Sequence, residues 1–310
     1  MSVVNKAQKK KKLNIFLILA TALISILAFL PIYKEDFPSI SSEWMKHVDD
    51  NTKLTELSIP GSHDSGARHS IADVAGKCQD MSIKDQLASG VRFLDIRLKL
   101  TNNKLVVVHD FVDQDLCFDD VIEDLVSFIQ TYDSETLIIS IKEDASPANS
   151  TISFDSALVQ QLSKYEGIFV FDDTLPENLG TARGNIYIIS RYAEASIGIP
   201  ADEGWKDSTT FTLNDFYIQD NYCVSEVKDK IEDIKQTFTY SSSETEQLTL
   251  NFTSCYLDSG FPPMYAGTTA KQINAWLLEY LDEYEGTLGI VISDYVTSEL
   301  VEKIYERNLK

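Results

Sequence analysis

The chain has 310 residues, 44% of them hydrophobic, and 27 Lys and Arg against 48 Asp and Glu give a formal net charge of −21. This hydrophobic content excludes a disordered chain, and the length suffices for one large domain or two small ones. The charge argues against nucleic acid as a partner, because affinity for phosphate backbones comes from neutralisation by Lys and Arg.

The N-terminal region has its own composition. Residues 1–12 contain five lysines and no acidic residue, and residues 13–32 carry no charge. A helix of that length spans the hydrocarbon of a bilayer, about 30 Å, and the lysines should stay in the cytoplasm. We therefore predict a basic cytoplasmic tail at 1–12, a transmembrane signal anchor at 13–32 and a linker at 33–43.

A cleaved signal peptide is the alternative for the same segment, since it also begins with a basic region and an apolar core. Such a core usually has about 7–15 residues, and the small residues Ala20 and Ala22 lie in the middle of this one rather than at its end. The length favours the anchor. In either case the acidic part of the chain is extracytoplasmic, held at the membrane or secreted after cleavage.

From residue 50 onward, short apolar runs alternate with amphipathic ones. Runs rich in Val, Ile, Leu and aromatic residues predict buried strands at 54–59, 91–100, 104–109, 136–142, 185–190, 215–220, 248–254 and 288–293. Amphipathic runs predict helices at 119–130, 224–238, 270–284 and 298–308. This alternation is typical of a parallel sheet wrapped by helices.

About eight strands in roughly 260 residues fit a (β/α)₈ barrel, although an open doubly wound sheet has the same alternation. The sequence contains no dinucleotide glycine fingerprint, internal repeat or long linker. We therefore expect a single α/β domain over residues 44–310.

Ionisable residues gather where the predicted strands end. In a barrel these ends meet on one face, where catalytic groups are found. A solvated loop residue is the alternative for each of them alone, but seven such strand ends, two of them with histidine, favour a site. The residues concerned are His63, Asp64, Asp95, Arg97, His109, Asp110, Lys142, Glu143, Asp144, Arg191, Asp220, Tyr222 and Asp294.

Several segments in order resemble the signatures of the bacterial phosphatidylinositol-specific phospholipases C (the X-domain family). They are SIPGSHDSG, QLASGVRFLDIR, VVVHD, ETLIISIKE, YIISRY, IQDNY, NFTS and VISDY, from about Trp44 to Asn308. The resemblance implies a distorted, incompletely closed TIM barrel. It also implies cleavage of phosphatidylinositol, and as a second substrate glycosylphosphatidylinositol, to diacylglycerol and inositol 1,2-cyclic phosphate. The implied partner is a membrane that contains phosphatidylinositol. The catalytic domain is expected to be a monomer.

The resemblance also implies the catalytic roles. His63 is the general base, oriented by Asp294, and His109 is the general acid, held by Asp64. Histidine suits both tasks because its ordinary pKa of about 6.5 allows proton exchange near neutral pH. Arg97 binds the phosphate. Calcium-dependent relatives carry an acidic ligand at the position of Arg97, so we expect no metal and no other cofactor.

Four further positions match the inositol-binding residues of that family: Lys142, Arg191, Asp220 and Tyr222. Two other functions stay open. One is a metal-dependent glycerophosphodiester or sphingolipid phosphodiesterase of a related barrel. The other is an inactive inositol-lipid-binding module, which the presence of both histidines, both aspartates and Arg97 disfavours.

Two features depart from the family pattern. Asp110 stands where relatives usually have Gly, and a carboxylate facing inward there would raise the pKa of His109. Outside the tail the chain carries 22 basic and 48 acidic residues, a net charge of −26, which repels an anionic bilayer. Lipid binding must then rest on the pocket cations, with the apolar run FPPMY at 261–265 as either an interfacial contact or a plain turn.

The four cysteines lack the close spacing of a structural zinc site, and an exported chain permits disulfides. Four cysteines allow three pairings. Loops gathered at one barrel face favour Cys78 with Cys117 and Cys223 with Cys255. Four unpaired thiols are the alternative.

Overall fold

The computed structural model describes residues 40–70, 76–110, 112–165, 167–243, 246–258 and 266–309. The predicted tail at 1–12, the predicted anchor at 13–32 and the 261–265 run lie outside the described residues. Within the described ranges, no helix is both long enough and apolar enough to cross a membrane.

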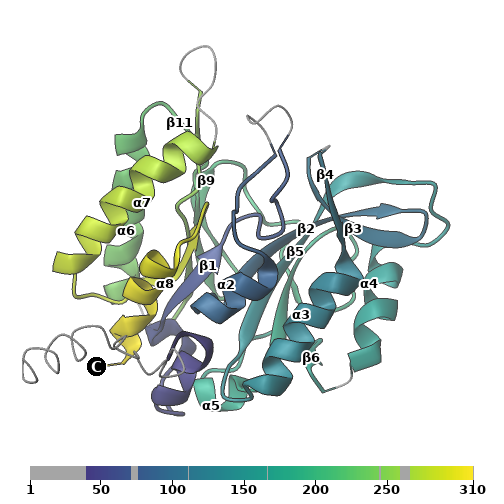
Figure 1. The fold of residues 1–310 in the computed structure, drawn as a ribbon, viewed down its shortest axis with the longest axis horizontal. Helices are drawn as coiled ribbons and strands as arrows, with labels where there is room; N and C mark the ends of the chain where they lie inside the picture. The colour runs from purple at the N-terminus through teal and green to yellow at the C-terminus, as the bar shows by residue number, and fades with distance from the viewer. Residues whose placement is uncertain are drawn as a thin grey trace, which may run out of the picture. The chain divides into compact units, whose positions relative to one another are not determined.

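One curled sheet with helices around it forms the domain (Figure 1). From β6 to β10 each neighbouring pair of strands is parallel, and β9 is antiparallel to β10. Because β6 and β9 stand at opposite ends of the order, the described strands form an open half-barrel. This confirms the predicted α/β fold, a distorted and incompletely closed TIM-type barrel. The order is β6 (Phe169–Val170), β7 (Ile186–Arg191), β5 (Leu137–Ala148), β2 (Phe93–Thr101), β1 (Ser58–Ser62), β14 (Gly289–Ser293), β12 (Leu248–Phe252), β10 (Phe216–Asp220) and β9 (Thr209–Leu213).

One predicted barrel strand has a different place. Residues 104–109 form β3 (Lys104–His109), which is antiparallel to β2 and continues into β4 (Val112–Cys117). Asn102 and Asn103 connect β2 to β3 with φ of +52° and +61°. Two successive residues with positive φ are typical of the type I′ turn, which fits the twist of a two-residue hairpin. The apolar pattern predicted the strand, but the Asn-Asn pair determines its direction.

The remaining strands are short. β8 (Ile199–Pro200) lies parallel to β7, and β11 (Cys223–Val224) pairs with β13 (Tyr256–Leu257) in a separate small sheet. The main helices are α2 (Ile83–Ser89), α3 (Phe118–Thr131), α4 (Phe154–Leu162), α5 (Leu179–Ala182), α6 (Val227–Ser243), α7 (Ala266–Glu283) and α8 (Ser298–Tyr305). Shorter 3₁₀ segments lie at Ile40–His47, Leu54–Glu56, Ser163–Tyr165 and Glu306–Asn308. The four predicted helices correspond to α3, α6, α7 and α8.

Helix starts follow from local hydrogen bonding. The side chains of Ser82, Ser153 and Thr297 each accept the backbone N–H of the residue three positions further along, at the starts of α2, α4 and α8. Such N-caps satisfy donors that have no partner within the helix. α2 ends at Gly90, whose φ of +117° suits a residue without a side chain.

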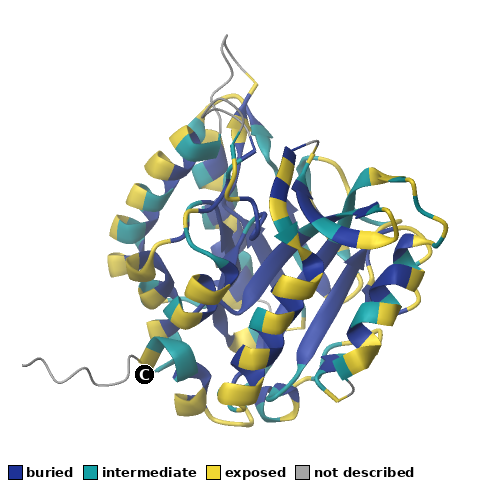
Figure 2. Cartoon of the chain, turned by 45° about the vertical axis from the view of Figure 1, so that its right-hand side comes forward, coloured by how far each residue is buried: buried dark blue, intermediate teal, exposed yellow. Residues whose placement is uncertain are grey.

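The core lies on both faces of the sheet (Figure 2). All residues of β1, β7 and β14 are buried, as expected for parallel strands covered by helices on both sides. One hydrophobic cluster includes the sheet, α3 and α4, while the other joins α6, α7 and α8. The apolar runs therefore fix the scaffold, and the polar strand ends are left for a site.

Arg92 lies immediately before β2, at the end of the sheet opposite the charged strand ends. Its Nε donates to Glu135 at 2.8 Å, and its two Nη atoms donate to the carbonyls of Leu87, Val91, Ser41 and Ser42. The arginine and the glutamate are almost completely buried. This ion pair therefore ties the start of the described chain to the base of the sheet.

All four cysteines are free thiols in the structure, so the two expected disulfides are wrong. In the second expected pair, Cys223 stands opposite Tyr256 in the β11–β13 ladder. Cys255 precedes Tyr256 by one residue and therefore points to the other face. In the first expected pair, Cys78 is buried whereas Cys117 is exposed on β4.

Candidate active site

The topology brings the charged strand ends together. β1 lies between β14 and β2, and Ser62 at its end is paired with Ser293. His63 and Asp294 are the next residues of these two strands, so they meet at the carboxyl edge of the sheet. On the other side of β1, the hydroxyl of Ser65 accepts the backbone N–H of Asp95 at 2.8 Å. The residues after β1 are thus fixed against both neighbouring strands.

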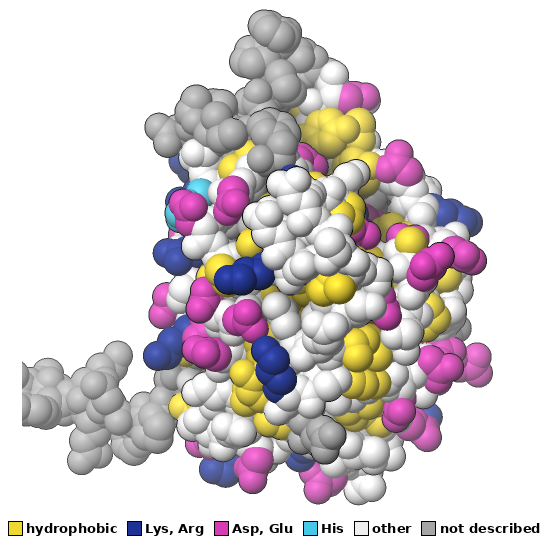
Figure 3. Space-filling model, turned by 90° about the vertical axis from the view of Figure 1, so that its right-hand side faces the viewer, with side chains coloured by type: hydrophobic (Ala, Val, Ile, Leu, Met, Phe, Trp, Pro, Cys, Tyr) yellow, Lys and Arg dark blue, Asp and Glu magenta, His cyan; other side chains and the backbone are white. Residues whose placement is uncertain are grey.

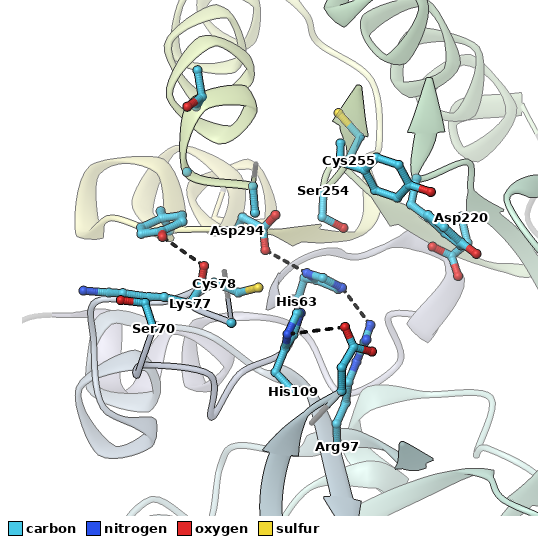
Figure 4. Close-up of a pocket in the computed structure, with 18 of the residues that line it drawn as sticks. His63, Ser70, Lys77, Cys78, Arg97, His109, Asp220, Ser254, Cys255 and Asp294 are labelled. Atoms are coloured by element: carbon cyan, nitrogen blue, oxygen red, sulfur yellow. Dashed lines mark hydrogen bonds and ion pairs between the residues drawn. The ribbon is translucent and has the colours of Figure 1, made fainter. Parts of the chain in front are cut away.

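The first histidine, His63, has a partner on each ring nitrogen. Its Nδ1 is 2.7 Å from Oδ1 of Asp294, and its Nε2 is 2.8 Å from Nη2 of Arg97 (Figure 4). Since the guanidinium can only donate, Nε2 is the acceptor, and the proton is assigned to Nδ1. Burial lowers the pKa of His63, but the Asp294 carboxylate outweighs burial and Arg97 and leaves this pKa above its ordinary value. This imidazole is arranged as a base.

The second histidine, His109, ends β3. Its Nε2 is 3.3 Å from Oδ2 of Asp64. Asp64 is fully buried, and neither of its carboxylate oxygens accepts a hydrogen bond. Burial raises the pKa of Asp64 above its usual value, although Arg97 and His109 act against it. Asp64 has φ of +44° in the tight turn after β1, a conformation that Asp tolerates better than most residues.

Arg97 on β2 joins the two histidine–aspartate pairs. Its Nη2 contacts His63, and its Nε lies 3.4 Å from Oδ2 of Asp64. Its Nε and Nη2 each lie 3.3 Å from Oδ2 of Asp95. Burial opposes its charge, but Asp64 and Asp95 hold the pKa of Arg97 well above its usual range. The side chain is 14% exposed, so it is a fixed cation that still faces the cavity.

Asp95 is a site residue that sequence reasoning noticed but did not assign. Its carboxylate also lies 3.5 Å from Nη1 of Arg191. Although burial opposes ionisation, Arg97 and Arg191 hold the pKa of Asp95 well below its usual range. The sequence feature that could have identified Asp95 is its i, i+2 spacing from Arg97 on one strand, which places both side chains on one face.

A second group of polar residues lies beside this centre. Arg191 ends β7, and its guanidinium carbon lies 3.6 Å from the ring centroid of Trp205. The indole of Trp205 donates to Oδ2 of Asp220 at 2.9 Å. Tyr222 donates its hydroxyl to Asp207. Trp205 was missed because nothing in its local sequence marks it, since its position depends on the chain folding back over β10.

Lys142 on β5 completes the ring of polar groups. Its ammonium is paired with Asp144, whose carboxylate is also 3.8 Å from Nη1 of Arg97. Burial opposes ionisation of Asp144, but Arg97 and Lys142 hold its pKa below the usual value. A cavity of about 900 Å³ opens over the site, and the predicted residues that line it are His63, Arg97, His109, Lys142, Arg191, Asp220, Tyr222 and Asp294. Asp64 lies behind its wall, against His109.

Asp110, the departure from the family pattern, points mainly to solvent. Its side chain is 67% exposed and its Oδ2 is 3.9 Å from Nδ1 of His109. Its φ is +52°, a backbone conformation that glycine adopts without strain. This explains why a glycine suits the position, and the exposed carboxylate is a distant neighbour of His109 rather than an inward-facing partner.

Two groups of residues in the described ranges have the chemistry to hold a metal ion. One contains His63, Cys78 and Asp294, and the other contains Asp64, Cys78 and His109. In each group the ligand atoms lie within 4.8 Å of one another. Cys78 was expected in a disulfide, so its place between the two histidines was not foreseen.

Three comparisons with known proteins agree. The family model for the phosphatidylinositol-specific phospholipase C X domain matches residues 51–164. The 1-phosphatidylinositol phosphodiesterase of Listeria monocytogenes is 27% identical over 282 residues, 86% of this chain and 85% of that protein. The protein of the same name from Staphylococcus aureus strain Newman is 28% identical over 235 residues, 68% of this chain and 74% of that protein.

Solved structures give the same result. A mutant of the phosphatidylinositol-specific phospholipase C from S. aureus has a TM-score of 0.75 at 25% identity, with 85% of this chain and 96% of that chain covered. That match covers most of this chain, and the range of the family model, 51–164, includes both histidines. Residues 51–164 thus match the phosphatidylinositol-specific phospholipase C X domain, and the half-barrel with its paired histidines is similar to the bacterial phosphatidylinositol-specific phospholipases C.

Proposed function

We propose that this chain cleaves phosphatidylinositol to diacylglycerol and inositol 1,2-cyclic phosphate, as a phosphatidylinositol diacylglycerol-lyase. The observation that carries the proposal is the position of Arg97, 2.8 Å from His63 and 3.4 Å from the carboxylate that pairs with His109. A phosphate bound to this guanidinium lies within reach of both imidazoles. The glycerophosphodiester and sphingolipid alternatives require carboxylates around a metal at the place where Arg97 stands.

His63 acts as the general base. Its Nε2 accepts the proton of the inositol 2-hydroxyl while the hydroxyl oxygen forms a bond to phosphorus. Asp294 holds the ring through Nδ1 and stabilises the imidazolium that forms. A general base of this kind contributes about 10²–10⁴ in rate.

His109 acts as the general acid. Asp64 lies 3.3 Å from Nε2 and orients the ring, so that Nδ1–H gives its proton to the glycerol oxygen as the bond from phosphorus to that oxygen breaks. Arg97 stabilises the negative charge that grows on the non-bridging oxygens, because its planar fork matches two of them. No step in this sequence needs a metal ion.

The neighbouring polar groups bind the inositol ring. Lys142 and Arg191 offer donors, Asp220 offers acceptors, and the ring of Tyr222 packs against the apolar face of the sugar. The same subsites accommodate the inositol of glycosylphosphatidylinositol as a second substrate. Asp95 and Trp205 are positioning residues, since Asp95 holds Arg97 and Arg191 and Trp205 holds Arg191 and Asp220.

The domain acts outside the cytoplasm on a membrane that contains phosphatidylinositol. We assign residues 1–12 to a cytoplasmic tail, 13–32 to an uncleaved anchor, 33–43 to a linker and 44–310 to a monomeric catalytic barrel, with secretion after cleavage as the alternative. Acidic side chains are spread over the face drawn in Figure 3. Attraction to anionic lipid therefore rests on the cations of the pocket. Protease treatment of intact cells should remove the barrel and leave the tail protected.

Phosphorus NMR tests the reaction directly. The full chain is incubated with phosphatidylinositol in detergent micelles, with a chelator present throughout. We expect the resonance of the five-membered cyclic ester to appear first. Activity that disappears with chelator would support a metal-dependent phosphodiesterase, and binding of phosphatidylinositol without any product would support the inactive module.

A further inference from the structure

Cys78 is a thiol inside the site with no part in the proposed proton transfers. It is 2% exposed, and Figure 4 shows its sulfur directed toward the two imidazole rings. Its backbone is held on both sides, since its N–H donates to the carbonyl of Ala67 at 2.8 Å and its carbonyl accepts from Tyr295 at 2.7 Å. The sulfur is therefore held at this position by a segment whose backbone is hydrogen-bonded to two other parts of the chain.

The carboxylate next to this sulfur lacks hydrogen bonds. Asp64 is fully buried, and neither oxygen accepts a hydrogen bond although Nε2 of His109 lies 3.3 Å from Oδ2. Zinc bonds to imidazole nitrogen and carboxylate oxygen are about 2.0–2.2 Å, so the corresponding edge of a tetrahedral site is about 3.3–3.5 Å. The separation of these two ligand atoms already has that length, which is long for a hydrogen bond.

We propose that Asp64, Cys78 and His109 form a binding site for a zinc ion that inhibits the enzyme. The three ligand atoms lie within 4.8 Å of one another. Thiolate with imidazole selects zinc over calcium or magnesium, which prefer oxygen ligands. The fourth position of the tetrahedron faces the cavity and takes a water molecule.

The second group of residues is a poorer site. Its histidine, His63, already has both ring nitrogens engaged, at 2.7 Å with Asp294 and at 2.8 Å with Arg97. Zinc there would have to displace a short hydrogen bond and approach the guanidinium directly. At the Asp64 site the carboxylate oxygens accept no hydrogen bond that zinc must displace, although Nε of Arg97 also lies 3.4 Å from Oδ2.

Binding forms a bond between zinc and sulfur and releases the thiol proton to solvent. An imidazole whose Nε2 holds zinc cannot become the imidazolium, and the general acid is lost. The inhibition rests on the proposed function, whereas the metal binding does not.

Direct titration tests the site on the full chain. Zinc affinity is measured by competition with a chromophoric chelator, and Co²⁺ is added separately to detect the near-ultraviolet charge-transfer band of a cobalt–thiolate bond. We expect one zinc per chain, and a loss of at least about 100-fold in affinity, with loss of the band, in Cys78→Ser. Cys117→Ser is the matched control, because Cys117 is an exposed thiol and should change neither readout.

A second ligand variant and an inhibition assay also test the zinc site. His109→Gln, which removes a second ligand, should also weaken zinc binding, and zinc should inhibit the wild type at concentrations that leave Cys78→Ser active. Equal zinc affinity in wild type and Cys78→Ser, with both folded by circular dichroism, overturns the proposal, as does the absence of binding at millimolar zinc. A chain that binds zinc through Cys78 yet never cleaves phosphatidylinositol keeps the metal site and refutes the catalytic proposal instead.

Discussion

Arg92, just before β2, and Arg97, in the middle of β2, show how the same side chain is used in two ways. Arg92 is almost completely buried, and its nitrogen atoms donate to one carboxylate and four carbonyls at 2.8–3.1 Å. Arg97 faces the cavity, and its contacts with carboxylates are longer, at 3.3–3.8 Å. One guanidinium has its bonding capacity filled by the fold, and the other keeps capacity for a ligand.

The pKa values of the two arginines are also shifted in opposite directions. Burial lowers the pKa of Arg92 in spite of Glu135, so keeping this guanidinium charged in the interior costs folding free energy. Around Arg97 several carboxylates more than offset burial and raise its pKa. A surplus of negative groups with incomplete hydrogen bonding is unfavourable for stability, but it keeps a cation ready for a phosphate. The comparison separates residues that hold the sheet from residues that act on substrate.

The largest effect should come from the histidines. His63→Ala and His109→Ala should each lower kcat/KM for phosphatidylinositol cleavage by about 10²–10⁴ or more, because each removes a proton-transfer group. The kcat/KM values are compared per folded molecule, with folding checked by urea unfolding. Turnover that stays unchanged in either variant removes that histidine from the mechanism.

The next largest effect should be on stability, at Arg92. Arg92→Met leaves Glu135 as an unpaired buried charge and should lower the free energy of unfolding by about 3–5 kcal/mol. The double variant Arg92→Met with Glu135→Gln should recover part of this loss. Activity of the folded fraction at low temperature should match the wild type. A large fall in kcat at unchanged stability contradicts the structural role.

At Arg97, unlike Arg92, the main effect of substitution should be on kcat. Arg97→Met should lower kcat by about 10²–10³, the loss typical of one electrostatic stabiliser of the transition state. Arg97→Lys should restore only part of it, since an ammonium lacks the planar fork. The free energy of unfolding in urea should also fall, because the buried carboxylates Asp64 and Asp95 lose their cation, so kcat is compared per folded molecule. Full activity in the lysine variant shows that a point charge suffices.

The smallest effect concerns pH at His63. Because its folded pKa is raised, His63 contributes stability that is complete below about pH 6.5 and is lost as the pH rises through the folded value. Activity has the opposite slope, since the base must be neutral. Asp294→Asn should move the acidic limb of the kcat/KM profile to lower pH. An unchanged limb excludes His63 as the titrating base.

Much of this site follows from sequence because parallel strands place their carboxyl ends together. That rule alone predicts that one edge of the sheet carries His63, Arg97, Arg191, Asp220 and Asp294. It works whenever the strands are adjacent and short loops follow them. The rule does not depend on the exact strand bounds, which shifted by a few residues at β1.

The rest depends on contacts between distant segments. The strand run at 104–109 does not reveal its antiparallel direction, and the free state of Cys78 follows from the packing of a whole segment. Trp205 reaches Arg191 and Asp220 only because the chain folds back beside β10. Residue patterns describe one element at a time, so such positions appear only in three dimensions.

The β3–β4 hairpin gives His109, the proposed acid, a looser support than His63, the proposed base, has. His63 follows a strand with parallel neighbours on both sides, whereas β4, the outer strand of the hairpin, pairs only with β3 within the described strands. Partial opening of an edge hairpin needs far less free energy than global unfolding. Warming should therefore release the proton donor while the phosphate pocket persists. Faster amide hydrogen exchange in residues 112–117 than in residues 58–62 would mark this local melting.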